Sequence, residues 1–416
     1  MTDDVAALVL HNNYRQSQAI SLAEFQAVDR SGEYRRFIRH FEDAGKLDRA
    51  LEFIPSDEEL AERRVQGKAL TRPELSVLIS YSKAVLKEDL IDSNLGEDNY
   101  LASAVKSAFP GRLVDEYETE VLEHRLHREI MATQVANDII NRMGFNFVRR
   151  QQKATGACVA DVARAYTAVM HIYDLAETWS AIESQDHLVS SGVQMEMMLG
   201  LISLVKRATR WLLRNRRHQL VPTLMIEEFR EGLDQLRTAF PAMLRGRASD
   251  QYQSLFDHFV EEGVEEDLAK TVASTNVGYT ALGIMQAAGE TDAPLLDVAS
   301  LYFTMGERLE LDWFSGQILA SKVDNEWQAL ARDTYLEDLE WQQRTLTVGA
   351  LRHLCEGETL LTCLQSWEKQ EASLLARWQD MLGELHATET PDFGMFAVAN
   401  RELLDLAQSS TRAAMA

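Results

Sequence analysis

Three groups of residues in this 416-residue chain could bind metal ions or polar partners, and each lies on one predicted helix. The first is the segment ETEVLEHRLHREI, in which Glu120 and His124, and Glu123 and His127, are four residues apart. Side chains at this spacing share a helical face and could hold a metal ion. Carboxylate sites in helical bundles, however, need a Glu-x-x-His pair repeated on further helices. No such repeat is visible, so we expect surface ion pairs and no metal ligand.

The second group is a line of arginines in VKRATRWLLRNRRHQ. Spacing of i, i+3, i+7 and i+10 places these four on one side of a helix: Arg207, Arg210, Arg214 and Arg217. An arginine fork binds a carboxylate or a phosphate through two hydrogen bonds. Three interpretations stay open: solvated or internally paired side chains, docking to an acidic surface of another domain or subunit, or binding of an anionic effector or nucleic acid. The aromatic interleaving that supports strand binding is missing.

The third group is a cluster of side-chain amides around a tyrosine in LHNNYRQSQAIS. Its members are Asn12, Asn13, Tyr14, Gln16 and Gln18. Such a cluster forms either a solvated polar face or a surface that hydrogen-bonds another domain, and both interpretations stay open. We treat it, with the arginine line, as a candidate docking surface.

Common nucleotide and hydrolase motifs are missing from the sequence. There is no Gly-x-Gly turn, so neither a dinucleotide site nor a kinase-type loop can be argued. Gly67-Lys68 lacks the upstream glycine and the hydroxyl residue of a P-loop. Neither HExxH nor GxSxG occurs.

The composition favours an all-α protein, a multi-helix bundle without a sheet. Only 7 prolines and 21 glycines interrupt the chain, and residues that lose little side-chain freedom in a helix are plentiful. Long helical patterns cover 112–143 and 157–189. Further patterns at 324–344 and 346–355 predict two helices, and the end of the chain from residue 408 is expected to be disordered.

The stretch ALTRPELSVLISYSK has an explicit helix start. Thr71 can cap the helix, Pro73 sits in the first turn, and Glu74 can reach back to the amide of Thr71. The stripe that follows predicts a packed core helix with this buried face: Leu75, Leu78, Ile79, Ser82 and Leu86. Whether Tyr81 and Lys83 face a neighbouring domain stays open.

Charge is distributed unevenly along the chain. The net charge is −23, of which residues 1–220 carry −4 and residues 221–416 carry −19. An acidic half repels phosphate backbones and anionic lipids, which disfavours nucleic acid and membrane partners. With Pro222, this change predicts two lobes and four segments: a first helix at 1–30, one lobe at 31–220, an acidic lobe at 221–390, and a partly disordered C-terminal helix and tail at 391–416.

The cysteines and the apolar runs indicate a soluble cytoplasmic protein. Cys158, Cys355 and Cys363 are few, odd in number and lack CxxC spacing, which fits a reducing compartment. No apolar run approaches the ~20 residues of a membrane span. MTDDVAALVL has acidic residues where a signal peptide needs a basic region.

Six stretches together resemble the C-terminal portion of the large bacterial NAD-specific glutamate dehydrogenases. They follow one another in order and at plausible spacing up to Leu339: HNNYRQSQAIS, PSDEELAER, LTRPELSVLISYSK, HRLHREIMATQVAN, RATRWLLRNRR and WQALARDTYLEDL. The resemblance implies a very long polypeptide with regulatory domains, then a dehydrogenase core that binds NAD through a Rossmann domain, then a helical C-terminal domain. Residues 1–30 would be the helix that follows the core.

The core's catalytic lysines and aspartate and its glycine-rich NAD turn have no counterpart in this sequence. We therefore expect no catalytic, NAD-binding or metal-binding residue in this chain, and no activity from it alone. The resemblance implies two partners, the dehydrogenase core and other subunits of a homo-oligomer. The alternative is a free-standing helical scaffold or adaptor. In that case Val5, Leu8 and Val9 should be covered by the chain's own core, whereas in a part of a larger enzyme they should be exposed.

Overall fold

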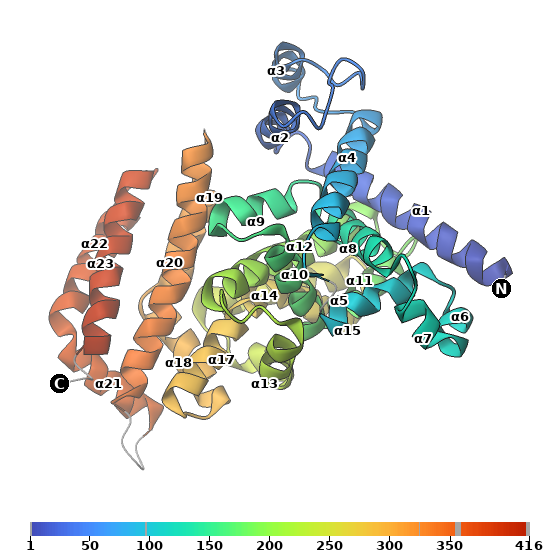
Figure 1. Cartoon of the computed structure of the whole chain (residues 1–416). Coiled ribbons are helices and arrows are strands. Elements are labelled where there is room, and N and C mark those ends of the chain that lie inside the picture. The colour runs from blue at the N-terminus through green and yellow to red at the C-terminus, as the bar shows by residue number, and fades with distance from the viewer. Residues whose placement is uncertain (1, 96–97, 324, 354–358, 413–416) are drawn as a thin grey trace. The chain divides into compact units, whose positions relative to one another are not determined.

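The computed structural model describes residues 2–95, 98–323, 325–353 and 359–412, and these ranges contain helices and no β-strand (Figure 1). The all-α prediction is therefore confirmed. The chain divides into two compact units. The first comprises Met1–Asp186 and Ser190–Glu227, and the second comprises His187–Val189 and Glu228–Ala416.

The first unit contains twelve α-labelled helices and one 3-10 helix among its described residues. In chain order they are α1 (Thr2–Phe25), α2 (Ser31–Asp43), α3 (Asp57–Val65), α4 (Arg72–Ile91), α5 (Asn99–Ala102), the 3-10 helix η2 (Ser103–Ala108), α6 (Gly111–Glu116), α7 (Glu118–Leu122), α8 (His127–Met143), α9 (Phe147–Thr155), α10 (Val159–Ile172), α11 (Leu175–Glu183) and α12 (Ser191–Asn215). Its core forms where α4 packs along α8 and α10 packs along α12. Helix α13 (Pro222–Met243) begins in this unit and ends in the second.

The start of α4 has the predicted geometry. The backbone amide of Thr71 donates to Glu74 Oε2 at 2.6 Å. Arg63, at the end of α3, donates to both oxygens of the same carboxylate at 3.0 and 2.9 Å. One glutamate thus caps α4 and ties α3 to it, which fixes the angle at which the chain enters the core.

The predicted buried face of α4 is confirmed for all of its members, Leu75, Leu78, Ile79, Ser82 and Leu86. Tyr81 on the same helix donates to Glu52 Oε1 at 2.6 Å. Lys83 is half-buried, and burial lowers the pKa of its amine to about 8. A role for these two residues toward another domain stays a prediction.

Two of the predicted long helices are interrupted. The segment 112–143 contains α6, α7 and α8, because α7 turns back against η2 and buries Val121. The segment 157–189 contains α10 and α11, separated at Asp174, whose φ of 49° lies in the left-handed region. An aspartate tolerates that conformation better than most residues do. Tertiary packing here overrides helical propensity, which does not detect such turns.

The second unit is built from the following helices among its described residues: α14 (Gly246–Glu261), α15 (Glu266–Ala273), α16 (Thr275–Gly278), α17 (Thr280–Thr291), α18 (Leu295–Arg308), α19 (Leu311–Ala320), α20 (Glu326–Leu351), α21 (Leu360–Gln370), α22 (Ala372–Ala387) and α23 (Phe393–Arg412). Helix α20 is continuous where the sequence predicted two helices. It packs along α23, which also packs along α22 (Figure 1).

The C-terminal segment differs from its prediction. Residues 408–412 are helical where the sequence indicated disorder, because α23 lies close against α20. A Cβ atom at Gly349 would lie 2.7 Å from the Cβ of Ser410, so glycine permits this approach. Ser410 is buried and accepts a hydrogen bond from Trp367 Nε1 at 3.0 Å. Residues 413–416 and Cys355 lie outside the described residues.

We expect Leu78→Ala to lower the free energy of unfolding of the first unit by about 3 kcal/mol, because it leaves a cavity between α4 and α8. Leu78 is 0% exposed. The matched control is Val65→Ala at the end of α3, which is 90% exposed and should change the free energy by less than about 0.5 kcal/mol. Chemical denaturation followed by circular dichroism measures both. Equal effects of the two substitutions would contradict the assignment of α4 to the core.

Candidate functional site

The amide cluster on α1 does not act as one group. Asn12, Asn13 and Gln16 are exposed, whereas Tyr14 is half-buried and Gln18 is buried. Gln18 makes contacts of 3.5 Å with the hydroxyl of Tyr14 and with Nε1 of Trp179 on α11. Burial and then the charge of Asp186 raise the pKa of Tyr14 to about 12, so its hydroxyl stays protonated. The structure therefore joins Tyr14 with Gln18, whereas the three others are exposed and make no such contact with that pair.

The first half of α1 also carries apolar side chains in solvent. Val5 and Val9 are exposed, and Leu10 is 68% exposed. Leu8 is half-buried. Burial on this helix is concentrated further along, at Gln18, Ala19, Leu22 and Ala23.

Arg207, Arg210 and Arg214 of the predicted line lie on α12, whereas Arg217 lies in the turn after it, and three of the four hydrogen-bond α9. Arg210 Nε donates to Gln151 Oε1 at 3.1 Å. The other two donate to backbone carbonyls: Arg214 to Ala154 at 3.1 Å and Arg217 to Thr155 at 2.8 Å. The last carbonyls of a helix have no partner within it and carry partial negative charge, which cations stabilise.

For Arg210, these contacts favour pairing within the chain over docking to another domain. Its side chain is only 6% exposed, which is too little to contact a partner. Arg207 is half-buried, and Arg214 and Arg217 are exposed. A role of these three in docking stays a prediction. The sequence showed the arginine face but not its partner, since the end of α9 is distant along the chain.

The histidine–glutamate segment does not form a continuous helical face. Helix α7 ends at Leu122 and α8 begins at His127, so Glu123 and His124 lie in the turn between them. The ring nitrogen Nδ1 of His124 accepts from the amide of Leu126 at 3.1 Å. In the part of the chain that the structure describes, no group of three or more His, Cys, Asp or Glu side chains is arranged to hold a metal ion.

No helix in the described ranges is both long and apolar enough to span a bilayer. Cys158 is exposed, whereas Cys363 is buried and its thiol donates to the carbonyl of Ala350 at 2.8 Å.

A cavity of about 500 Å³ lies in the first unit and is lined by residues of α1, α5, η2, α8, α10 and α11. This volume is in the range that holds small-molecule ligands. Its charged wall comprises four residues that the sequence patterns did not single out: Arg15, Asp138, Arg142 and Glu183. The i,i+4 spacing of Asp138 and Arg142 on α8 was the one local signal that could have indicated them.

Asp138 and Arg142 form an ion pair in which Arg142 is buried and Asp138 is half-buried, and neighbouring helices complete it. Arg142 Nη1 lies 2.6 Å from Asp138 Oδ1 and donates to Oδ2 at 2.8 Å. Tyr166 on α10 donates to the same Oδ2 at 2.8 Å, and the guanidinium of Arg142 lies 5.7 Å from the ring centre of Trp179. Burial opposes the charge of Arg142, but Asp138, Tyr166 and Glu183 outweigh it and raise its pKa above the usual value.

Arg15 and Glu183 are held much more loosely. Arg15 Nε lies 3.7 Å from Glu183 Oε1, and Arg15 Nη1 lies 3.9 Å from Asp138 Oδ1. Both separations are too long for hydrogen bonds. Burial, followed by the charge of Arg142, lowers the pKa of Arg15. These two side chains therefore face each other with opposite charges and without hydrogen-bonding each other.

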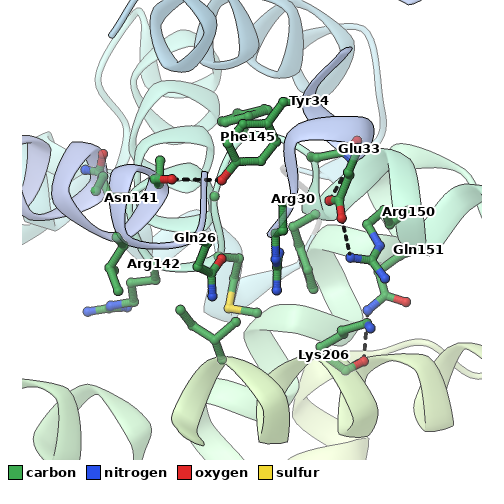
Figure 2. A pocket seen from close by; sticks show the side chains of 18 residues that line it. Gln26, Arg30, Glu33, Tyr34, Asn141, Arg142, Phe145, Arg150, Gln151 and Lys206 are labelled. Carbon is green, nitrogen blue, oxygen red and sulfur yellow. Dashed lines mark hydrogen bonds and ion pairs between the residues drawn. The ribbon is translucent and has the colours of Figure 1, made fainter. Parts of the chain in front are cut away.

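A second, smaller pocket of about 50 Å³ surrounds Glu33 (Figure 2). Asn146 Nδ2 and Arg150 Nη1 donate to the two oxygens of Glu33 at 2.9 and 3.1 Å. Beside them, Gln151 Nε2 donates to the carbonyl of Lys206 at 2.9 Å. Figure 2 shows Arg142 extending away from Glu33. The space suits a water molecule better than an organic ligand.

We expect Glu33→Gln to destabilise the first unit most at neutral pH. Burial raises the pKa of Glu33, but Arg150, Arg30 and Asn146 lower it more, so the folded value lies below the usual 4.5. The stabilisation is therefore full above about pH 5 and is lost as the pH falls through the folded pKa. Urea unfolding at several pH values should show a difference between the parent and the variant that shrinks in acid. A difference independent of pH would contradict this, and Glu24→Gln, at an exposed ion pair with Arg72, is the control with an expected effect below about 1 kcal/mol.

The chain matches a protein-family model and several curated relatives. The family model described as "Glutamate dehydrogenase, C-terminal" matches residues 67–405. An NAD-specific glutamate dehydrogenase of Pseudomonas aeruginosa is 45% identical over 410 residues, which is 99% of this chain and 25% of that protein. The enzyme of the same name from Halomonas elongata is 44% identical over 413 residues, covering 99% of this chain and 26% of the relative.

A more distant relative also matches nearly the whole of this chain over about a quarter of its own length. The NAD-specific glutamate dehydrogenase of Mycobacterium tuberculosis is 28% identical over 420 residues, covering 99% of this chain and 25% of the relative. The chain thus spans about a quarter of the length of the curated relatives it matches. Since the family model covers most of its residues, the chain belongs to the glutamate dehydrogenase C-terminal family.

Proposed function

We propose that this chain acts as the C-terminal helical domain of an NAD-dependent glutamate dehydrogenase, where it provides scaffold, docking and regulation for the catalytic core. The parent enzyme would convert L-glutamate, NAD+ and water to 2-oxoglutarate, ammonium, NADH and a proton. The observation that carries the proposal is the match of nearly the whole chain to a quarter of each NAD-specific relative.

Hydride transfer and NAD binding are assigned to the remainder of the enzyme. A Rossmann domain needs a parallel sheet and a glycine-rich turn. The described ranges contain no strand, and the sequence contains no Gly-x-Gly. The isolated chain should therefore form no NADH from L-glutamate and NAD+.

The exposed apolar side chains of α1 support a docking role. Val9 and Leu10 lie in solvent on the half of α1 that contributes least to the chain's own core. Exposed apolar surface of this kind marks contacts with other domains or subunits. We infer that this half of α1 packs against the dehydrogenase core. The partners would be that core and further subunits of a homo-oligomer in the cytoplasm.

The alternative is a free-standing helical scaffold or adaptor. Such a protein should cover the apolar face of α1 with its own residues. Of the three residues that distinguish the two, Val5 and Val9 are exposed and Leu8 is half-buried, so two of the three favour the dehydrogenase over this alternative.

An immunoblot of source-cell extract with an antibody raised against this chain tests the proposal. Because the chain spans about a quarter of its relatives, we expect a band roughly four times heavier than 47.1 kDa. Depleting the extract with the same antibody should remove its NAD-dependent glutamate dehydrogenase activity. A band at 47.1 kDa, with the activity left in the extract, would favour the free-standing scaffold.

Docking by α1 is tested by Leu10→Glu in the long enzyme. A charge placed in an apolar contact weakens it, so we expect lower NADH formation or loss of the native oligomer on size-exclusion chromatography. Leu51→Glu is the matched control, because Leu51 is 70% exposed and Leu10 is 68% exposed. If both variants keep the activity and the elution volume of the parent, α1 does not dock the core.

A further inference from the structure

The large cavity of the first unit contains two charged side chains whose buried atoms lack hydrogen bonds. Within the described ranges, Arg15 Nε and Glu183 Oε1 are buried without a hydrogen-bond partner. The side chain of Glu183 is only 10% exposed. A buried polar atom without a partner is costly, and buried polar atoms in native structures rarely lack one.

Asp138 and Nη1 of Arg142 already bind each other, whereas Arg142 Nε, like Arg15 Nε, lacks a hydrogen-bond partner. Asp138 accepts from both Arg142 and Tyr166, so its oxygens serve the packing of α8 against α10. Burial and then the charge of Arg15 lower the pKa of His11, so this imidazole is neutral at physiological pH and adds no cation. The wall thus offers the carboxylate of Glu183 and, beside it, the guanidinium of Arg15 for a ligand to bind.

From this pair we propose that the cavity binds a small zwitterion, an α-amino acid, whose carboxylate accepts from Arg15 and whose ammonium donates to Glu183. The two protein groups lie side by side, with Arg15 Nε 3.7 Å from Glu183 Oε1. An α-amino acid carries its carboxylate and ammonium on one carbon atom and so presents two opposite charges at a similarly short separation. Arginine suits the carboxylate because its planar fork donates two parallel hydrogen bonds.

The remainder of the cavity fits the side chain of such a ligand. Asn12, Gln134 and Asn137 also line it and offer both donors and acceptors. Trp179 and Met170 add apolar surface. The volume of about 500 Å³ leaves room beyond the two charged groups. The two arginines and two carboxylates of the wall carry no net charge, which favours a ligand that is itself neutral overall.

The test uses the purified 416-residue chain. Its thermal unfolding is followed with each common L-α-amino acid in turn at millimolar concentration, and the ligand with the largest upward shift is then titrated by calorimetry. Saturable binding at one site is expected. The 2-oxo acid with the same side chain, which keeps the carboxylate and lacks the ammonium, should bind about tenfold to a hundredfold more weakly. No shift with any amino acid would overturn the proposal, as would equal binding of the 2-oxo acid.

Substitutions test whether Arg15 binds the carboxylate of the ligand and Glu183 binds its ammonium group. Arg15→Gln should weaken binding of the amino acid by about tenfold to a hundredfold, and Glu183→Gln should remove the preference for the amino acid over its 2-oxo acid. Arg377→Gln is the control, since Arg377 lies on α22 and pairs at the surface with Glu402. Circular dichroism checks that each variant folds. If Arg15→Gln does not fold, Arg15→Lys keeps the charge without the fork and should show the same loss. Unchanged binding in the folded Arg15 and Glu183 variants would overturn the proposal.

Discussion

Asp138 and Arg142 lie one turn apart on α8, and three other helices bring side chains to them. Tyr166 of α10 donates to the carboxylate, Trp179 of α11 lies beside the guanidinium, and Arg15 of α1 approaches from the third side. Arg142 is buried, and a buried charge is tolerated only when its partner and hydrogen bonds satisfy it, because its desolvation can outweigh the attraction. Side chains of α10 and α11 complete this pair, and the same helices line the cavity.

Local sequence signals predicted the parts of the fold that depend on local chemistry. Thr71 and Glu74 defined the start of α4, and the apolar stripe from Leu75 onward identified its buried face. The interruption at Asp174 escaped prediction because it depends on packing and not on a helix-breaking residue. Likewise, nothing near Ser410 in the sequence showed that a glycine on α20 lets α23 approach closely.

The candidate sites were predicted less well than the helices, because their residues come together only through tertiary packing. Helical spacing placed four arginines on one helix, of which Arg217 lies beyond the end of α12, and a hydrogen-bond partner such as Gln151 on α9 cannot be read from spacing. Arg15 lies within the predicted amide cluster of α1 but was not part of that prediction. Glu183 is the last residue of α11, which the sequence predicted to be part of one helix over 157–189. Only tertiary packing brings these two charges together, so no local pattern could have paired them.

Helix α1 carries both the proposed docking surface and one wall of the cavity. Leu10 is exposed on it, and Arg15, little more than one turn further on, lines the cavity. An α-helix rises about 1.5 Å per residue and moves as a rigid element over so short a distance. A shift of α1 by an ångström would change the 3.7 Å separation of Arg15 and Glu183 by a comparable amount. A partner that packs on Leu10 and a ligand that bridges Arg15 and Glu183 therefore act on the position of one helix. Binding of one would therefore strengthen binding of the other if both favour the same position of α1, and weaken it if they favour different positions.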